Sequence, residues 1–268
     1  MRIEVKSKIF KRQYIWFEQF DTFDEIQTLH DVDVVLIRAN KIKFLENDYV
    51  LCNKQNSLYA DLYMPETELW NLINKTFKYH INRSKRDNII IKTYTSQQIL
   101  ENKYILNNLA EVYSNMYIEK GITGESLCIN ELEALACSGN LIITVAMFDD
   151  KPIVYHSYIF NDCNCRLLQS CSEFRVVDKN MKNLIGRANK RLHWEDMLLF
   201  KNKGLKYYDW GGVSSFDSPN GIDTFKMSFG NEKISYYNIT IFKSYRRKVV
   251  AKIMKVISNI LKTSIVSI

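Results

Sequence analysis

Residues 204–212 read GLKYYDWGG, and residues 221–230 read GIDTFKMSFG. Both stretches belong to a window, residues 186–230, that holds six of the nine glycines of the chain, whereas no glycine precedes Gly121. Glycine adopts backbone conformations that other residues rarely reach, and it lets a ligand approach the main chain closely. We therefore expect the functional site in this window.

The pattern around these stretches predicts an alternation of strands and helices. Apolar residues recur with helical spacing over 183–203, and Gly204 follows as a helix stop. The two glycines at 211 and 212 are expected to interrupt the strand before them. Strands are predicted at 32–37, 56–63, 88–95, 141–148, 153–160, 166–172, 206–210 and 234–242, and helices at 66–84, 97–120, 129–136, 183–203 and 222–229.

The composition indicates a folded protein without a membrane-spanning segment. The 268 residues are 46% hydrophobic and 25% charged, and no run of about 18 apolar residues occurs. The first twenty residues lack the apolar core of a secretion signal. We therefore expect a cytoplasmic protein with six reduced cysteines. Cys163 and Cys165 are too close together for a zinc knuckle, so no metal site is expected.

The quoted segments resemble the FemABX-type branch of the GNAT acyltransferase superfamily. The resemblance rests on the Asp-aromatic-Gly-Gly end of the strand, on Phe-Lys-x-x-Phe-Gly at 225–230, and on a long helix that ends in Phe-Lys-x-x-Gly at 200–204. It covers about residues 58–242, where the order of elements also agrees. It implies an α/β (α+β) fold with a GNAT-like, mixed and mostly antiparallel sheet flanked by helices.

The chain is expected to have three parts. By the resemblance, residues 1–95 would form a reduced N-terminal GNAT-like half and residues 96–242 the acyltransferase domain. The pattern of charge and apolar spacing predicts a basic amphipathic C-terminal helix at residues 243–268.

The family implies acyl transfer through a tetrahedral intermediate, which needs donors aimed at the developing oxyanion. Lys226, the lysine of the Phe-Lys motif, is expected to stabilise that charge, with Phe225 shaping the pocket. Asp209 would hold or deprotonate the acceptor, beside Trp210 and the backbone of Gly211 and Gly212. The alternatives are a solvated helix lysine at 226 and a carboxylate at 209 that only caps the glycine turn.

The helix at 184–194 occupies the place where GNAT enzymes hold the pyrophosphate of coenzyme A. Only Gly186 remains of the usual glycine-rich approach, which weakens the case for coenzyme A against aminoacyl-tRNA. Arg187 and Arg191 share a face that could meet phosphate, although a solvated basic face is the simpler interpretation. Gly186, Asn189 and His193 lie at the border of the apolar stripe, where a pocket wall is expected.

Two histidines are candidates for the general base. His193 lies on this helix, and His156 shares one face of its strand with Tyr158, a candidate substrate contact. A histidine near its usual pKa accepts a proton at neutral pH. The alternative for each histidine is a packing residue with satisfied hydrogen bonds.

Charge is concentrated in the tail. Residues 243–268 hold five lysines, two arginines and no acidic residue, which equals the net charge of +7 of the whole chain. Apolar residues recur there with helical spacing, which is typical of a helix on an anionic membrane surface. The rival interpretation is a helix docked on the body or on a second subunit. Contact with RNA is a further alternative, but the tail has few aromatic residues between its basic residues.

The sequence thus predicts a cytoplasmic acyltransferase, peripheral at the inner face of the membrane. It would move a small acyl group from acyl-CoA to an amine or hydroxyl of a cell-envelope or polysaccharide precursor: a nucleotide-linked sugar, a lipid-linked sugar or a muropeptide. The alternatives are an aminoacyl-tRNA-dependent transferase of the peptidoglycan type, and a non-catalytic module that binds a nucleotide-sugar or a partner.

Overall fold

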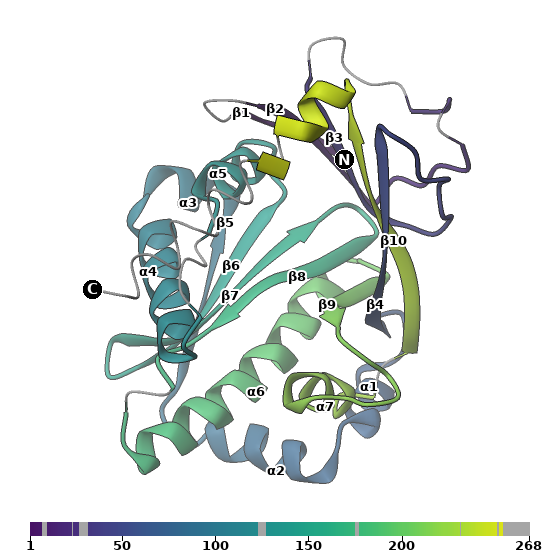
Figure 1. The fold of residues 1–268 in the computed structure, drawn as a ribbon. Helices are drawn as coiled ribbons and strands as arrows, with labels where there is room; N and C mark the ends of the chain where they lie inside the picture. The colour runs from purple at the N-terminus through teal and green to yellow at the C-terminus, as the bar shows by residue number, and fades with distance from the viewer. Residues whose placement is uncertain are drawn as a thin grey trace. The chain divides into compact units, whose positions relative to one another are not determined.

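The computed structural model of the chain is an α/β fold, as predicted (Figure 1). It describes residues 1–6, 10–22, 24–26, 32–122, 127–174, 177–230, 232–250 and 252–253. The chain forms two compact units: Met1–Gln55 with Ser235–Ile268, and Asn56–Ile234. The boundaries of these units differ from the predicted division at residues 95 and 242. That division concerns which segments correspond to the two halves of a GNAT-like fold, and it remains a proposal.

The first unit is built on strands. β1 (Arg2–Lys6) pairs antiparallel with β2 (Lys11–Trp16), β2 pairs parallel with β3 (Val34–Asn40), and β3 pairs antiparallel with β10 (Glu232–Phe242). Alternate apolar side chains of these strands make a core of their own. Its fully buried members are Ile15, Ile37 and Ile239.

The second unit contains a mixed sheet with the strand order β4-β9-β8-β7-β6-β5. Neighbouring strands are antiparallel, except that β8 and β9 are parallel. The strands are β4 (Val50–Asp61), β5 (Ile90–Thr95), β6 (Leu141–Phe148), β7 (Lys151–Phe160), β8 (Asn164–Cys171) and β9 (Tyr207–Val213). β6, β7 and β8 form the predicted antiparallel meander, and each of its two pairings contains one register shift.

Helices pack on both faces of this sheet. Successive side chains of β7 point to opposite faces: Tyr155 hydrogen-bonds Asn108 of α4, and His156 hydrogen-bonds Asp196 of α6. The helices are α1 (Glu66–Leu72), α2 (Lys75–Ser84), α3 (Ser96–Glu101), α4 (Tyr104–Glu119), α5 (Ile129–Cys137), α6 (Lys179–Asn202) and α7 (Gly221–Met227). The 24-residue α6 therefore presents one side to the sheet and the other to α2 and α7 (Figure 1).

Two predicted helices are each broken in the structure. The helix expected at 66–84 is α1 and α2, because Ile73 is extended and buried while the N–H of Asn74 bonds the carbonyl of Ser228 at 2.8 Å. The side chain of Asn74 then caps α2. The helix expected at 97–120 is α3 and α4, because Asn102 leaves the helical conformation between them.

The strand expected to stop before the two glycines continues through them. β9 runs to Val213, and its register against β4 shifts between the pairs Tyr59–Asp209 and Ser57–Gly212. The shift is a β-bulge with Gly211 at φ 76°. A Cβ on Gly211 would stand 2.9 Å from the carbonyl oxygen of Leu167, so glycine is required there for space as well as for conformation.

The described start of the basic tail docks on its own unit. Residues 245–250 are helical, Arg247 pairs with Asp33 at 3.0 Å, and the buried Lys248 donates to the carbonyl of Asn47 at 3.1 Å. This matches the docked-helix interpretation for that part. Residue 251 and residues 254–268, on which the predicted membrane contact mainly depends, lie outside the described residues. None of the helices in the described part combines the length and the hydropathy that crossing a bilayer requires.

Candidate functional site

A cavity of about 390 Å³ lies in the second unit, between the end of α4, the end of β8, the first half of α6, and α7. Its described lining carries three lysines and a histidine but no carboxylate. The residues concerned are Lys120, Lys190, Lys226 and His193, with Asn189, Ser170, Ser172, Cys171, Phe174, Phe225, Ile222, Ile185, Leu167, Met116, Gly186 and Gly221 around them. The cavity is therefore suited to an anionic or carbonyl-bearing ligand.

Lys226 reaches this cavity from the last turn of α7. Its Nζ donates a hydrogen bond of 2.6 Å to the carbonyl oxygen of Gly212. Burial, together with the positive charge of Arg166, lowers the pKa of Lys226 to about 8. The ammonium form therefore still dominates at neutral pH, and it is only partly solvated. A cation in such an environment stabilises a nearby negative charge more strongly than one in water does.

Helix α7 is fixed by a cluster of hydrogen bonds at its N-terminus. Asn220 caps the helix and shares a capping box with Asp223. Asp223 also accepts from the backbone and hydroxyl of Ser214, which anchors the loop before the helix. Burial acts to raise the pKa of Asp223, but these hydrogen bonds outweigh it and the pKa is lowered. The loop and α7 together hold Lys226 against the bulge.

Asp209 lies behind the cavity and not in its lining. Its buried carboxylate forms an ion pair with Arg166 and accepts hydrogen bonds from the hydroxyl of Ser57 and from the N–H of Gly211, the latter at 2.8 Å. The expectation that Asp209 holds the acceptor is not supported by this placement. Its partners match the alternative of a cap for the glycine bend, with an ion pair between β8 and β9 added.

The other residues of the Asp-aromatic-Gly-Gly motif also lie outside the cavity lining. Trp210 is fully buried, with its ring 4.8 Å from that of His193, and it does not line the cavity, so the expected substrate contact is not supported. The N–H of Gly211 is taken by Asp209, which removes it as an oxyanion donor. Gly212 contributes its carbonyl to Lys226. Phe225 does line the cavity, and its ring lies 5.5 Å from that of His193.

His193 is buried on α6 and lines the cavity. Its Nδ1 lies 3.3 Å from the hydroxyl of Tyr208. Burial, reinforced by His156, Lys226 and Lys190, lowers the pKa of His193 well below the usual value. His193 is therefore neutral at pH 7 and has a lone pair available on one ring nitrogen.

The second candidate base is enclosed. His156 is fully buried, and both of its ring nitrogens have partners: Asp196 at 2.7 Å and Asn189 at 2.8 Å. The equally buried Tyr158 donates to Asp196 at 2.7 Å. Neither His156 nor Tyr158 lines the cavity, so the expectation that they touch substrate is not supported.

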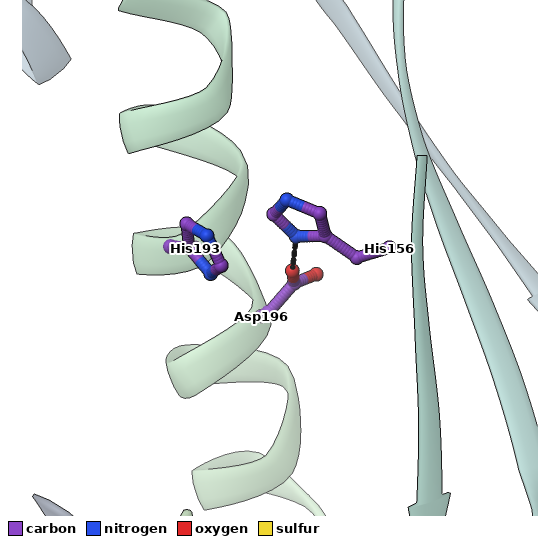
Figure 2. A group of neighbouring side chains, drawn as sticks. All are labelled: His156, His193 and Asp196. Atoms are coloured by element: carbon purple, nitrogen blue, oxygen red, sulfur yellow. Dashed lines mark hydrogen bonds and ion pairs between the residues drawn. The ribbon is translucent and has the colours of Figure 1, made fainter. Parts of the chain in front are cut away.

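Figure 2 shows His193 and Asp196 on α6 beside His156 of the neighbouring strand, with the ligand atoms of the three within 4.8 Å of one another. The rings of His156 and His193 are stacked with centroids 4.0 Å apart. Both ring nitrogens of His156 already have hydrogen-bond partners, Asp196 and Asn189, so neither is available to an ion in this arrangement. The oxygen of Asp196 also already accepts two hydrogen bonds. We therefore interpret the group as a hydrogen-bonded network.

The arginines of α6 have structural partners. Arg187 pairs with Asp87 at 2.6 Å, and Arg191 donates to the carbonyls of Ser84 and Ile89. Arg191 lines neither the cavity described above nor the second cavity described below, so the expected phosphate contact of Arg191 is not supported.

Arg187 lines a second cavity of about 430 Å³, which shares Phe174, Gly186 and Lys190 with the first. Its described lining is basic: Arg83, Lys182, Arg187 and Lys190, with His80 and Asn183.

Sequence reasoning placed Gly186, Asn189 and His193 at a pocket wall, and all three line the cavity. It missed Lys190, Cys171 and Asp196. Lys190 follows Gly186 by one helical turn and so shares its face, which is a signal that the sequence carried. Burial raises the pKa of Cys171 to about 12, which favours the protonated form of this lining thiol.

No protein-family model and no curated protein matches the sequence. Solved structures do match. FemX has a TM-score of 0.59 at 11% identity, over 89% of this chain and 83% of that one. The C-terminal domain of a protein described as a lysylphosphatidylglycerol synthetase, from Agrobacterium fabrum, has a TM-score of 0.51 at 11% identity, over 82% and 71%. The predicted FemABX-like fold is thereby confirmed: the chain folds like FemX.

Proposed function

We propose that the protein is an acyltransferase whose reaction takes place in the cavity between α6 and α7. The observation that carries this proposal is the position of Lys226, a half-buried cation with a lowered pKa, in the same cavity as the neutral His193. One group can stabilise negative charge and the other can accept a proton. Attack on an ester or thioester carbonyl requires both.

Lys226 would stabilise the oxyanion of the tetrahedral intermediate. Its ammonium is held by the carbonyl of Gly212, and the side chain forms part of the cavity lining. A preorganised donor in a partly dry site costs no rearrangement as charge develops on the carbonyl oxygen. Phe225, from the same helix, forms the apolar wall beside the acyl group.

His193 would take the proton that the attacking amine or hydroxyl loses. The new bond forms between the acceptor atom and the carbonyl carbon, and the proton passes to the free ring nitrogen. The bond from carbon to the leaving sulfur or oxygen then breaks, and the leaving group takes the proton from His193, which restores the neutral imidazole. We assign this role to His193 and not to His156, because only His193 lines the cavity.

The donor would carry phosphates into the second cavity. Its arginines and lysines adjoin the reaction cavity at Lys190, which lines both. Arginine and lysine side chains recognise phosphate oxygens. Coenzyme A thioesters and aminoacyl-tRNA share this chemistry, and we rank coenzyme A first and aminoacyl-tRNA second. For the acceptor we propose an amine or hydroxyl of a cell-envelope precursor; the name of the synthetase with the same fold refers to an aminoacylated envelope lipid.

The test is transfer itself. Purified protein is incubated with radiolabelled acetyl-CoA or charged tRNA and with a panel of nucleotide-linked, lipid-linked and muropeptide acceptors. We expect label on one acceptor class, and a loss of about 100-fold or more with Lys226→Ala. Lys75→Ala removes an exposed lysine of α2 and serves as the matched control. Binding of a ligand with no transfer by any pair would instead support the non-catalytic module.

A further inference from the structure

We propose that Asp196, acting through Tyr158 and Tyr208, is a positioning residue that holds His193 in the Nδ1–H tautomer and so directs the lone pair of Nε2 to the reaction. The inference rests on the proposed function of His193 as base. It assigns a role to three buried residues that do not line the cavity.

The four residues form an unbroken hydrogen-bonded chain. Asp196 meets the hydroxyl of Tyr158 at 2.7 Å, the two tyrosine hydroxyls meet at 2.7 Å, and Tyr208 meets Nδ1 of His193 at 3.3 Å. Each of the four is no more than 2% exposed, so the protein itself supplies these partners. The chain begins at a carboxylate and ends at the one member that reaches the cavity.

The direction of each bond follows from counting protons. A carboxylate only accepts, so the single hydroxyl proton of Tyr158 points to Asp196. The oxygen of Tyr158 must then accept from Tyr208, which uses the only hydroxyl proton of Tyr208. The contact between Tyr208 and His193 is therefore made by a proton on Nδ1. A neutral imidazole has one such proton, so Nε2 carries the lone pair.

A second branch keeps Asp196 in place. Nδ1 of His156 lies 2.7 Å from the same carboxylate oxygen, and Nε2 of His156 lies 2.8 Å from the amide oxygen of Asn189, a residue of the cavity lining. Figure 2 shows the carboxylate of Asp196 directed at His156. With two donors on one oxygen, Asp196 is fixed as the acceptor end of the chain.

The charged and titratable groups around His193 make this orientation important. His156 from β7, Lys190 from α6 and Lys226 from α7 all oppose a positive imidazole. Asp196, on the same helix as His193, carries the negative charge at the other end of the hydrogen-bonded chain. Through the two hydroxyls, that charge stabilises the imidazolium that forms when His193 accepts a proton. The arrangement has the logic of a catalytic triad with two tyrosines inserted.

The decisive variants are Tyr158→Phe and Tyr208→Phe, which remove one hydroxyl each and keep the rings in the core. We expect each to lower kcat about tenfold with KM unchanged, because neither hydroxyl lines the cavity. Because the bonds are in series, the double variant should lose little more than either single one. Tyr155→Phe, on the other face of β7 and bonded to Asn108, is the matched control and should retain kcat.

The second measurement needs no substrate. Nitrogen NMR of the resting protein, assigned with His193→Gln, should find the proton of His193 on Nδ1, and in Tyr208→Phe it should move to Nε2. Finding Nε2–H in the unmodified protein, or unchanged kcat in both phenylalanine variants, overturns the inference. The Nδ1–H tautomer with no transfer from any donor would refute the proposed function and leave the network standing.

Discussion

Nζ of Lys226 lies 2.6 Å from the carbonyl oxygen of Gly212, one residue after the glycine that forms the bulge of β9. The conformation of a strand thereby determines where a helix lysine enters the cavity. The two sequence stretches that resemble the FemABX motif are thus joined by a direct hydrogen bond. The predictions below test what this bond and its surroundings do.

The first prediction concerns pH. Because the pKa of Lys226 is lowered to about 8, its ammonium form is lost as pH rises through that value. We expect kcat/KM to fall above about pH 8, although a free amine acceptor becomes more abundant there. In Lys226→Arg this alkaline decline should disappear, because a guanidinium stays protonated. A pH profile of both proteins checks this, and an identical decline in the two would assign it to another group.

The second prediction concerns the bulge. Gly211→Ala places a non-glycine residue at φ 76° and sets its Cβ 2.9 Å from the oxygen of Leu167. We expect a loss of more than about 3 kcal/mol in the free energy of unfolding, since the left-handed conformation alone costs about 1–3 kcal/mol. Gly204→Ala has a similar φ, 81°, and no atom within 4 Å of its Cβ, so it isolates the conformational cost. Equal losses in urea unfolding would contradict the steric part of the account.

The third prediction tests whether Asp209 has a structural role or a catalytic one. Asp209→Asn leaves the buried guanidinium of Arg166 without its carboxylate, which typically costs about 3–5 kcal/mol of stability. The protein that remains folded at low temperature should keep the acidic limb of the pH profile, because Asp209 does not line the cavity. Its alkaline limb should move to lower pH, because the charge of Asp209 raises the pKa of Lys226. A lost acidic limb in the pH profile of Asp209→Asn would instead make Asp209 a base.

Much of the fold follows from local patterns. The three-stranded meander was predicted from short strand-like runs separated by turn residues, and the long helix from apolar residues at helical spacing. The breaks at Ile73 and Asn102 were not predicted, because the first depends on a bond to Ser228, which is distant in sequence, and the second on one residue leaving the helix. Continuation of β9 through two glycines likewise depends on pairing with β4. Such long-range hydrogen bonds leave no periodic signal.

The site was predictable to a different extent. Lys226, Phe225 and Asn189 were identified from a motif and a helical border, and all three line the cavity. Asp209 and His156 were chosen for their chemistry, yet each is enclosed by partners from other strands or helices. A single sequence shows which residues could react, but it does not show which of them already form hydrogen bonds or ion pairs with residues distant in the sequence.

The last prediction concerns the tail. Arg247 and Lys248 are engaged by Asp33 and Asn47, so they should add little to membrane attraction. Lys255 and Lys262 are the two basic residues within 254–268, and they would act together with the apolar residues of that segment, each lysine near the surface contributing about 1 kcal/mol. We expect flotation with phosphatidylglycerol vesicles but not with phosphatidylcholine vesicles, and its loss when residues 254–268 are removed. Lys255→Gln with Lys262→Gln should weaken it at unchanged length, whereas equal flotation of the full and shortened chains would show that the tail is no anchor.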